Sequence, residues 1–360
     1  MSSIRRLAAA VGVAGAAAGL AIAPATQALA SPRPSFINMF SHVTTVAKTG
    51  GTPRGVAVIP HSTGKLTAGN VLVSNSSGAT GNNIVEISPS GHRTVFATLP
   101  SKLPGTCPGG VQLTAALSVL PGGWVIAGSD PASGQNGCLI VIGPQGNVRE
   151  TIAGDGIAGP WGSAAVSHVH GNGWVADLFV STTLNGTWAG KGTVVSRGAV
   201  ERLTITIPGN TLPQLTNVTP VASGLAEQVK GGKVFGPAGI GLSASFTLYI
   251  ADSDTNQVSS VAHATTRGAT AGPGTFLTGA GVLPGGLGAL SVPQGVAIAP
   301  TNGNVLTVNA GNGKIVDTTP FGVQIANRTL GGALGALAVA PGGRGVYFTD
   351  AKAGTLRLLH

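Results

Sequence analysis

One short phrase recurs six times along this chain of 360 residues, and it constrains the fold more than any other feature. Each copy has a small residue, then alternating aliphatic residues, and in most copies a Pro before a Gly-rich turn. The copies are Gly55–Pro60, Ala116–Pro121, Ala165–His170, Gly239–Ala244, Gly295–Pro300 and Ala336–Pro341. Self-similarity of this kind indicates a repeat architecture built from one supersecondary unit.

A second strand-like segment follows each copy of the phrase and ends in a small polar residue. These residues are Asn75, Ser129, Thr182, Asp252, Asn309 and Asp350. A third strand and, in several units, a fourth come next, and the 58 Gly and 23 Pro residues suit the tight turns between them. The pattern predicts an all-β, six-bladed β-propeller of four-stranded antiparallel blades. A two-sheet sandwich offers no reason for a sixfold phrase.

The two ends of the repeat region predict how the ring closes. The last unit stops at its third strand, 355–360, and a strand-like segment, 42–47, precedes the first phrase. We expect this N-terminal segment to supply the outer strand of the last blade.

Residues 1–30 are predicted to be a signal peptide, of the Sec or the twin-arginine type. Arg5 and Arg6 precede an apolar run, 7–23, and Ala28-Leu29-Ala30 fits an A-x-A cleavage site. We therefore expect a secreted or periplasmic protein whose residues 31–360 form a single propeller domain. We also expect a monomer with no stable membrane insertion after cleavage.

Charge and cysteine content narrow the function classes. The chain carries a formal net charge of +9, yet its basic residues form no run with interleaved aromatic residues. Nucleic-acid binding is therefore not expected. We interpret the scattered charge as diffuse solubilising charge, and the alternative is a modest attraction to anionic polymers or surfaces. In an exported chain, the pair Cys107 and Cys138 predicts one disulfide.

Three segments resemble NHL repeats, a family of propeller blades: 148–156, 248–258 and 293–300. The resemblance implies a six-bladed propeller in the wider grouping of gluconolactonase-like and amidoglycolate-lyase-like propellers. Members of this grouping serve as binding modules and as enzymes, so the resemblance does not choose between the two.

The resemblance also implies a candidate metal site. Lactonase-like propellers hold an ion near the channel mouth with a Glu, an Asn and an Asp, which here match Asn75, Asp252 and Asp350 or Asn309. The Glu has no counterpart, because Glu86 lies in a third strand. Six small polar side chains around one mouth could bind Ca²⁺. Alternatively, they cap the turn after each second strand by hydrogen bonding to the backbone.

Histidine and tryptophan residues supply further candidates. His168 and His170 lie two apart on a predicted strand and could share a Zn²⁺ ion, with His61 as a third ligand. The alternative is that the histidines are buried and hydrogen-bonded. Trp188 lies in a long insertion and Trp161 precedes the same blade. Both could bind carbohydrate or peptide, or could plug the edge of the blade.

Two functions follow from these observations. The favoured one is an NHL-like binding module for a protein or glycan ligand. The alternative is a metal-dependent, lactonase-like hydrolase or lyase with its site at the channel mouth and Ca²⁺ or Zn²⁺ as its cofactor. The sequence does not decide whether the protein is an enzyme.

Overall fold

A computed structural model describes residues 34–360, apart from 79–81, 131–134, 155, 184–191, 210, 270–271 and 280–287. The predicted signal peptide lies outside these residues. Within the described part of the chain, no helix has the length and hydrophobicity needed for a membrane span.

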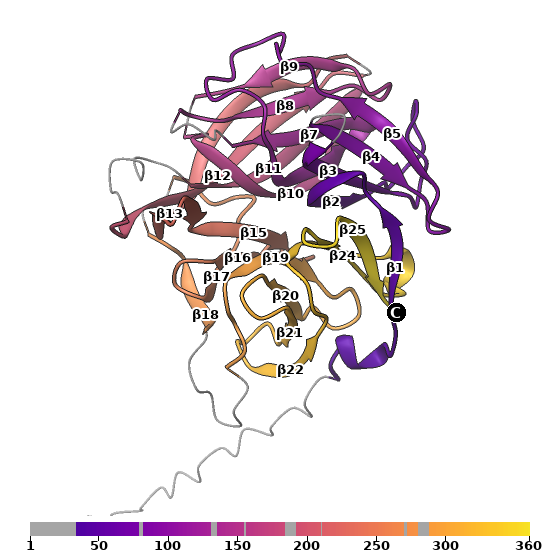
Figure 1. Ribbon diagram of the computed structural model, residues 1–360. Coiled ribbons are helices and arrows are strands. Elements are labelled where there is room, and N and C mark those ends of the chain that lie inside the picture. The colour runs from indigo at the N-terminus through magenta and orange to yellow at the C-terminus, as the bar shows by residue number, and fades with distance from the viewer. Residues whose placement is uncertain are drawn as a thin grey trace, which may run out of the picture. The chain divides into compact units, whose positions relative to one another are not determined.

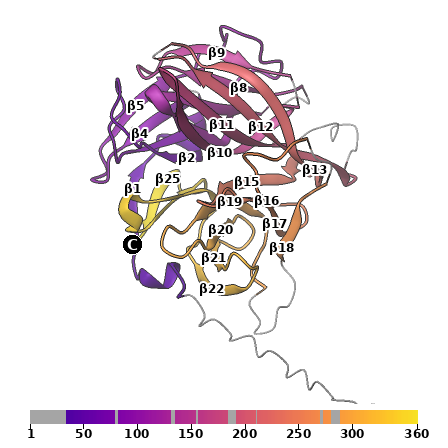
Figure 2. The ribbon, with the colours of Figure 1, turned by 180° about the vertical axis from the view of Figure 1, so that it is seen from behind.

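Six antiparallel sheets follow one another along the chain, and each is one blade (Figures 1 and 2). Blade 1 contains β2 (Gly51–Val58), β3 (Val71–Gly78), β4 (Asn83–Ile87) and β5 (Arg93–Thr98). Blade 2 contains β6 (Leu113–Leu120), β7 (Trp124–Ser129), β8 (Cys138–Ile142) and β9 (Val148–Ile152). Blade 3 contains β10 (Gly159–His170), β11 (Gly173–Thr183), β12 (Val195–Ile207), β13 (Gln214–Lys230) and β14 (Lys233–Phe235).

The remaining blades complete the set. Blade 4 contains β15 (Pro237–Leu242), β16 (Leu248–Asp252), β17 (Gln257–Val261) and β18 (Thr275–Gly279). Blade 5 contains β19 (Pro293–Ile298), β20 (Val305–Asn309), β21 (Lys314–Thr318) and β22 (Gln324–Thr329). Blade 6 contains β23 (Leu334–Val339), β24 (Val346–Asp350), β25 (Thr355–Leu359) and β1 (Val43–Lys48). The predicted six blades are confirmed, with one difference: the third sheet has a fifth strand, β14.

The first strands of the blades form the inner wall of a closed ring. Strand β2 contacts β6, and the series continues through β10, β15, β19 and β23 back to β2. Six buried apolar clusters lie between the blades, one for each pair of neighbours. A single blade could not bury both of its faces, so this radial stacking provides the core.

The ring closes as predicted, by the pairing of β1 with β25 in blade 6 (Figure 1, indigo beside yellow). The residues before β1 are anchored on blade 5. The buried Asp317 carboxylate accepts hydrogen bonds from the Phe36 and Ile37 backbone amides at 2.6 and 3.3 Å. Phe36 and Ile37 are themselves fully buried in the cluster between blades 5 and 6. The N-terminal segment thus connects two blades.

Each innermost strand carries a register shift directly after its first residues. In blade 1, Pro53 pairs with Asn75 and Val56 with Val73, so the first strand has one extra residue. The other five blades have a shift at the same place, with one extra residue in blades 3 to 6 and two in blade 2, between Leu113 and Leu117. We call the residue after each paired start the first bulge residue, and these are Arg54, Thr114, Trp161, Ala238, Gln294 and Gly335. A bulge bends its strand and turns the local side chains.

The glycines beside the first bulge residues let neighbouring blades approach closely. A Cβ on Gly295 would lie 2.5 Å from the Gly335 carbonyl oxygen of the next blade. A Cβ on Gly239 would overlap the Gln294 carbonyl oxygen. The innermost strands therefore pack backbone to backbone, which explains the small residue that opens the repeat phrase in every blade except blade 3, where Gly162 has this place.

Hydroxyl groups connect the bulges of neighbouring blades. Ser74 Oγ accepts from the Gly55 amide at 2.8 Å and donates to the Thr114 carbonyl of blade 2 at 2.8 Å. Ser181 does the same between Gly162 and the Ala238 carbonyl of blade 4.

Blade 6 has the same connection to blade 1. Thr349 Oγ1 accepts from the Ala336 amide at 2.9 Å and donates to the Arg54 carbonyl at 3.4 Å. Three of the six blade interfaces thus share one bridge.

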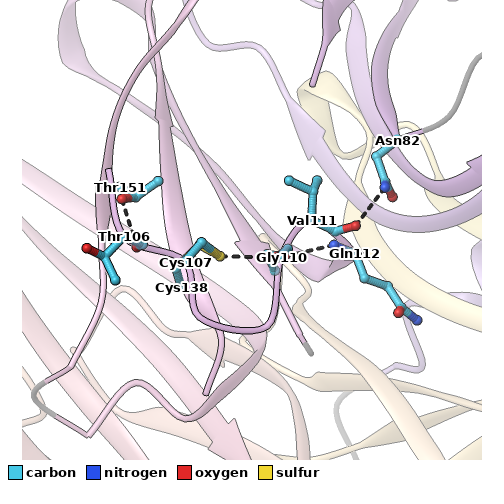
Figure 3. The surroundings of a disulfide bond; sticks show 9 residues. Asn82, Thr106, Cys107, Gly110, Val111, Gln112, Cys138 and Thr151 are labelled. Carbon is cyan, nitrogen blue, oxygen red and sulfur yellow. Dashed lines mark hydrogen bonds between the residues drawn. A yellow bond between two sulfur atoms is a disulfide. The ribbon is translucent and has the colours of Figure 1, made fainter. Parts of the chain in front are cut away.

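The predicted disulfide between Cys107 and Cys138 is present, with Cα atoms 5.2 Å apart (Figure 3). Cys107 lies in the connection from blade 1 to blade 2, and Cys138 begins β8. The Asn82 side chain of blade 1 donates to the Val111 carbonyl of the same connection at 2.8 Å. The disulfide and this hydrogen bond hold the blade 1–blade 2 connection in place.

We predict that Ser181→Ala lowers the free energy of unfolding by about 1–3 kcal/mol, because a buried amide and a buried carbonyl lose their partner. Denaturant unfolding measures the change, and Ser245→Ala at an exposed turn is the matched control. Equal midpoints for the two variants would show that the bridge does not stabilise the ring.

Candidate ligand site at the channel opening

The six predicted polar residues occupy one structural position in the blades. Each lies at or near the end of a second strand and pairs with the start of the innermost strand, as Asn75 does with Pro53 and Asp252 with Pro237. The second strand continues to Gly78 in blade 1 and to Thr183 in blade 3. All six side chains are buried: Asn75, Ser129, Thr182, Asp252, Asn309 and Asp350. The sequence alignment of the blades was therefore correct at this position.

The two carboxylates of this set bind backbone amides. Asp252 Oδ1 accepts from the amides of Asp254 and Thr255 at 2.9 and 3.1 Å. Burial raises the pKa of Asp252, and these backbone hydrogen bonds oppose the rise. Asp350 Oδ1 accepts from the amides of Ala333 and Ala353 at 3.2 and 3.1 Å. Both side chains cap the turn that follows their strand.

The asparagines connect the second strand to the segment that enters the blade. Asn75 Nδ2 donates to the Thr49 carbonyl at 3.1 Å, and Asn309 Nδ2 donates to the Ala289 carbonyl at 2.7 Å. Their Oδ1 atoms are buried without a hydrogen-bond partner. These two oxygens belong to blades 1 and 5, which are not neighbours.

These contacts test whether the set fits a shared cation. One oxygen of each carboxylate already accepts two backbone hydrogen bonds, and Asp350 Oδ2 is paired with Arg357. The two unpartnered asparagine oxygens lie on separate blades. Among the residues that the structure describes, no group of three His, Cys, Asp or Glu could hold an ion. The contacts favour the capping interpretation, and metal coordination at Asn75, Asp252, Asn309 and Asp350 stays a prediction.

The three predicted histidine ligands are exposed. His61 follows β2, whereas His168 and His170 lie at the end of β10 and pair with Val175 and Gly173. The alternative that they are buried is therefore wrong. Because Ser163 is the register equivalent of Val56, His168 corresponds to His61 rather than to an aliphatic position. Zinc binding by these residues stays a prediction.

The structure describes only one of the two predicted tryptophans. Trp188 lies outside the described residues. Trp161 is not in a loop but is the first bulge residue of β10, half-buried, and its Nε1 donates to Gln294 Oε1 at 3.0 Å. Gln294 is the first bulge residue of blade 5. This hydrogen bond passes over blade 4 and joins two alternate blades at the channel opening.

The first bulge residues alternate in size around the ring. Blades 1, 3 and 5 carry Arg54, Trp161 and Gln294, whereas blades 2, 4 and 6 carry Thr, Ala and Gly. We call the three large ones the mouth residues. Arg54 and Gln294 were missed in the sequence analysis. A Pro-x-Gly sequence opens four innermost strands, at Pro53, Pro160, Pro237 and Pro293. The same pattern also occurs in turns, for example at Pro144 and Pro320, so the pattern alone does not identify these residues.

Arg54 places a positive charge beside a buried acid. Its Nε donates to Ser76 Oγ at 2.9 Å, and its guanidinium forms no ion pair within the described residues. Burial raises the pKa of Asp130, directly after β7 of blade 2, to about 7, and Arg54 opposes this rise. Burial also lowers the pKa of Arg54, which Asp130 partly counteracts. Asp130 Oδ1 has no hydrogen-bond partner.

The space around the mouth residues suits a ligand at the opening rather than inside the channel. The cavity between the innermost strands, lined by residues from all six blades, has a volume of about 40 Å³. A water molecule occupies about 30 Å³, so the cavity is too small for a sugar. A shallow depression at the opening is lined by Trp161, Thr183, Pro237 and Ser253, among others.

Comparisons with known proteins show the fold. No family model and no curated protein matches the chain. One similar solved structure is the calcium-binding protein regucalcin from Agrobacterium tumefaciens, with 16% identity, a TM-score of 0.53, and coverage of 89% of this chain and 93% of that one. Another is a gluconolactonase from Xanthomonas campestris, with 11% identity, a TM-score of 0.53, and coverage of 89% and 93%.

A third is the PQQ-bound aldose sugar dehydrogenase from Streptomyces coelicolor, with 15% identity, a TM-score of 0.54, and coverage of 88% and 97%. These likenesses confirm the expected resemblance to gluconolactonase-like propellers at the level of the fold. The NHL assignment of the repeats stays a prediction.

We predict that stability falls as pH rises from about 4 to about 7, because the unfolded chain releases the Asp130 proton while the folded protein keeps it. Below this range Asp130 is protonated in both states, and the raised pKa costs no stability. Above it Asp130 is ionised in both states, and the full cost of the raised pKa, up to about 4 kcal/mol, applies. Asp130→Asn should flatten this slope in denaturant unfolding at several pH values.

Part of the pH dependence of stability should remain in the Asp130→Asn variant, because burial also raises the pKa of Glu201 to about 7. Glu201→Gln should remove that part. An unchanged slope in the Asp130→Asn variant would contradict the assignment.

We predict that Asp252→Ala lowers the free energy of unfolding by about 1–3 kcal/mol, because two backbone amides lose their acceptor. Adding Ca²⁺ to chelator-treated protein should leave the melting temperature of the wild type unchanged. A calcium-induced rise that Asp252→Ala abolishes would instead support the metal site.

Proposed function

We propose that this propeller is a binding module that holds an acidic carbohydrate at its channel opening. The hydrogen bond between Trp161 and Gln294, together with Arg54 at the equivalent position of blade 1, is the observation that carries the proposal. The Arg54 guanidinium forms no ion pair within the described residues. A half-buried indole held in one orientation offers an apolar surface to a sugar ring. An Arg can bind a sugar carboxylate through two parallel hydrogen bonds.

The charge of the whole protein supports an anionic ligand. The formal net charge is +9, and a positive field raises the local concentration of anionic ligands. The rigid ring also favours binding, because the mouth residues lie on strands rather than on long loops. A site that is already arranged loses little conformational entropy when the ligand binds.

A second candidate, hydrolysis of a lactone, is favoured by Asp130. A carboxyl group with a pKa of about 7 is divided between its acid and base forms at neutral pH, as a general acid–base catalyst requires. In this function Asp130 would accept a proton from the attacking water, and Arg54 would bind a carboxylate or a developing negative charge. The solved structures of a gluconolactonase and of regucalcin share the fold that this function would use.

We predict that the protein binds short uronic-acid oligosaccharides, and that Arg54→Gln and Trp161→Ala each weaken this binding at least tenfold. The loss of a charge-assisted hydrogen bond costs about 1.5–3 kcal/mol, which corresponds to about tenfold or more. Isothermal titration calorimetry measures the affinity. Neutral oligosaccharides of the same length test the need for the carboxylate.

Two exposed residues far from the mouth provide matched controls, Arg344→Gln and Trp174→Ala. Equal loss in control and mouth variants, or no binding to any acidic oligosaccharide, would contradict the binding proposal. Lactone hydrolysis that Asp130→Asn abolishes would establish the second candidate.

A further inference from the structure

Two histidines face each other where the ring closes. His42 precedes β1 and His360 follows β25, and their backbones exchange two hydrogen bonds, at 2.8 and 2.9 Å. They are therefore a directly opposed pair whose side chains point to the same face of the sheet. Their ring centroids are 6.2 Å apart, and both side chains are exposed.

This separation lets both imidazoles reach one ion. A Zn²⁺–N bond of about 2.0–2.1 Å places the ion about 3.2 Å from each ring centroid. Two rings bound to one ion are then about 5.2 Å apart at a tetrahedral angle and about 6.4 Å apart when collinear. The observed 6.2 Å lies inside this range. Exposed side chains can close the remaining distance of about 1 Å by small changes in their χ angles.

We propose that His42 and His360 bind a divalent transition-metal ion across the closing strand pair. Neutral imidazole prefers Zn²⁺, Ni²⁺ and Cu²⁺ over Ca²⁺ or Mg²⁺, so the ion belongs to the first group. Two protein ligands leave the other coordination positions to water. The site is separate from the mouth residues and does not depend on the proposed ligand.

Because the two histidines lie on the strands that close the ring, a bound ion affects the stability of the closed ring. β1 joins β25 only when the ring is closed, and opening the ring separates His42 from His360. An ion that binds only the closed form stabilises it by mass action. Metal binding at this pair therefore strengthens the closure of the propeller.

One neighbouring charge opposes the ion. The Arg328 guanidinium donates hydrogen bonds to the carbonyls of Phe40 at 2.6 Å and Ser41 at 2.5 Å, two residues and one residue before His42. Repulsion between this guanidinium and the bound ion weakens binding. Arg328→Gln should thus tighten metal binding, a consequence that a site elsewhere on the protein would not share.

The test compares melting temperatures of protein without a polyhistidine tag, with Zn²⁺ or Ni²⁺ added and then removed by EDTA. We expect the ion, at about 100 times its Kd, to raise the melting temperature by about 3 °C. His42→Ala and His360→Ala should each abolish the rise. The double variant His168→Ala/His170→Ala, which removes the other closely spaced pair, should keep it.

A second measurement is independent of thermal unfolding. Calorimetric titration with Zn²⁺ should show one ion per chain, lost in His42→Ala, and limited proteolysis should show that the ion protects the β1 segment. If the rise in melting temperature persists in His42→Ala but is lost in the His168/His170 double variant, the site is on blade 3 and the proposal is wrong. No bound ion at the closing pair would also overturn it.

Discussion

Close approach of the six innermost strands around a narrow axis is the constraint on which the rest of the structure depends. Six backbones can meet there only if each strand bends and carries almost no side chain at the contact. The bulge provides the bend, and a residue such as Gly239 or Gly295 provides the space. The hydroxyls of Ser74, Ser181 and Thr349 then satisfy buried backbone groups that the bulges leave without partners in their own ladder.

The same bulge creates the candidate site. An extra residue in the innermost strand cannot join the ladder, so its side chain is free to lie at the opening. Six large side chains would collide there, and the alternation between large residues in blades 1, 3 and 5 and small ones in blades 2, 4 and 6 avoids this. The hydrogen bond from Trp161 to Gln294 passes over Ala238, the small residue of the blade between them. The bulge therefore determines both how the innermost strands pack and where the side chains of the candidate site lie.

The sequence was sufficient to predict the blades, the closing strand and the disulfide, because each depends on residue types that repeat or pair. It misplaced the phrase of blade 3, where the register equivalent of Gly55 is Gly162 rather than Ala165. Blade 3 has longer strands than its neighbours, so the most regular aliphatic stretch lies beyond the bulge. The role of Asp252 could not be decided either, since a turn cap and a metal ligand require the same side chain. Only the backbone amides around it distinguish the two roles.

The division of roles within the bulge explains why proteins of this fold can differ so much in chemistry. The second bulge position meets the carbonyl of the next blade and must stay small, as the Gly239–Gln294 contact shows. The first bulge position holds residues as different as Arg54, Trp161 and Gly335 within the same ring. In blade 6 it is restricted as well, because a Cβ on Gly335 would lie 2.7 Å from Thr349 Oγ1. One ring of this fold therefore accommodates very different side chains at its opening, which is why the fold alone does not identify a ligand.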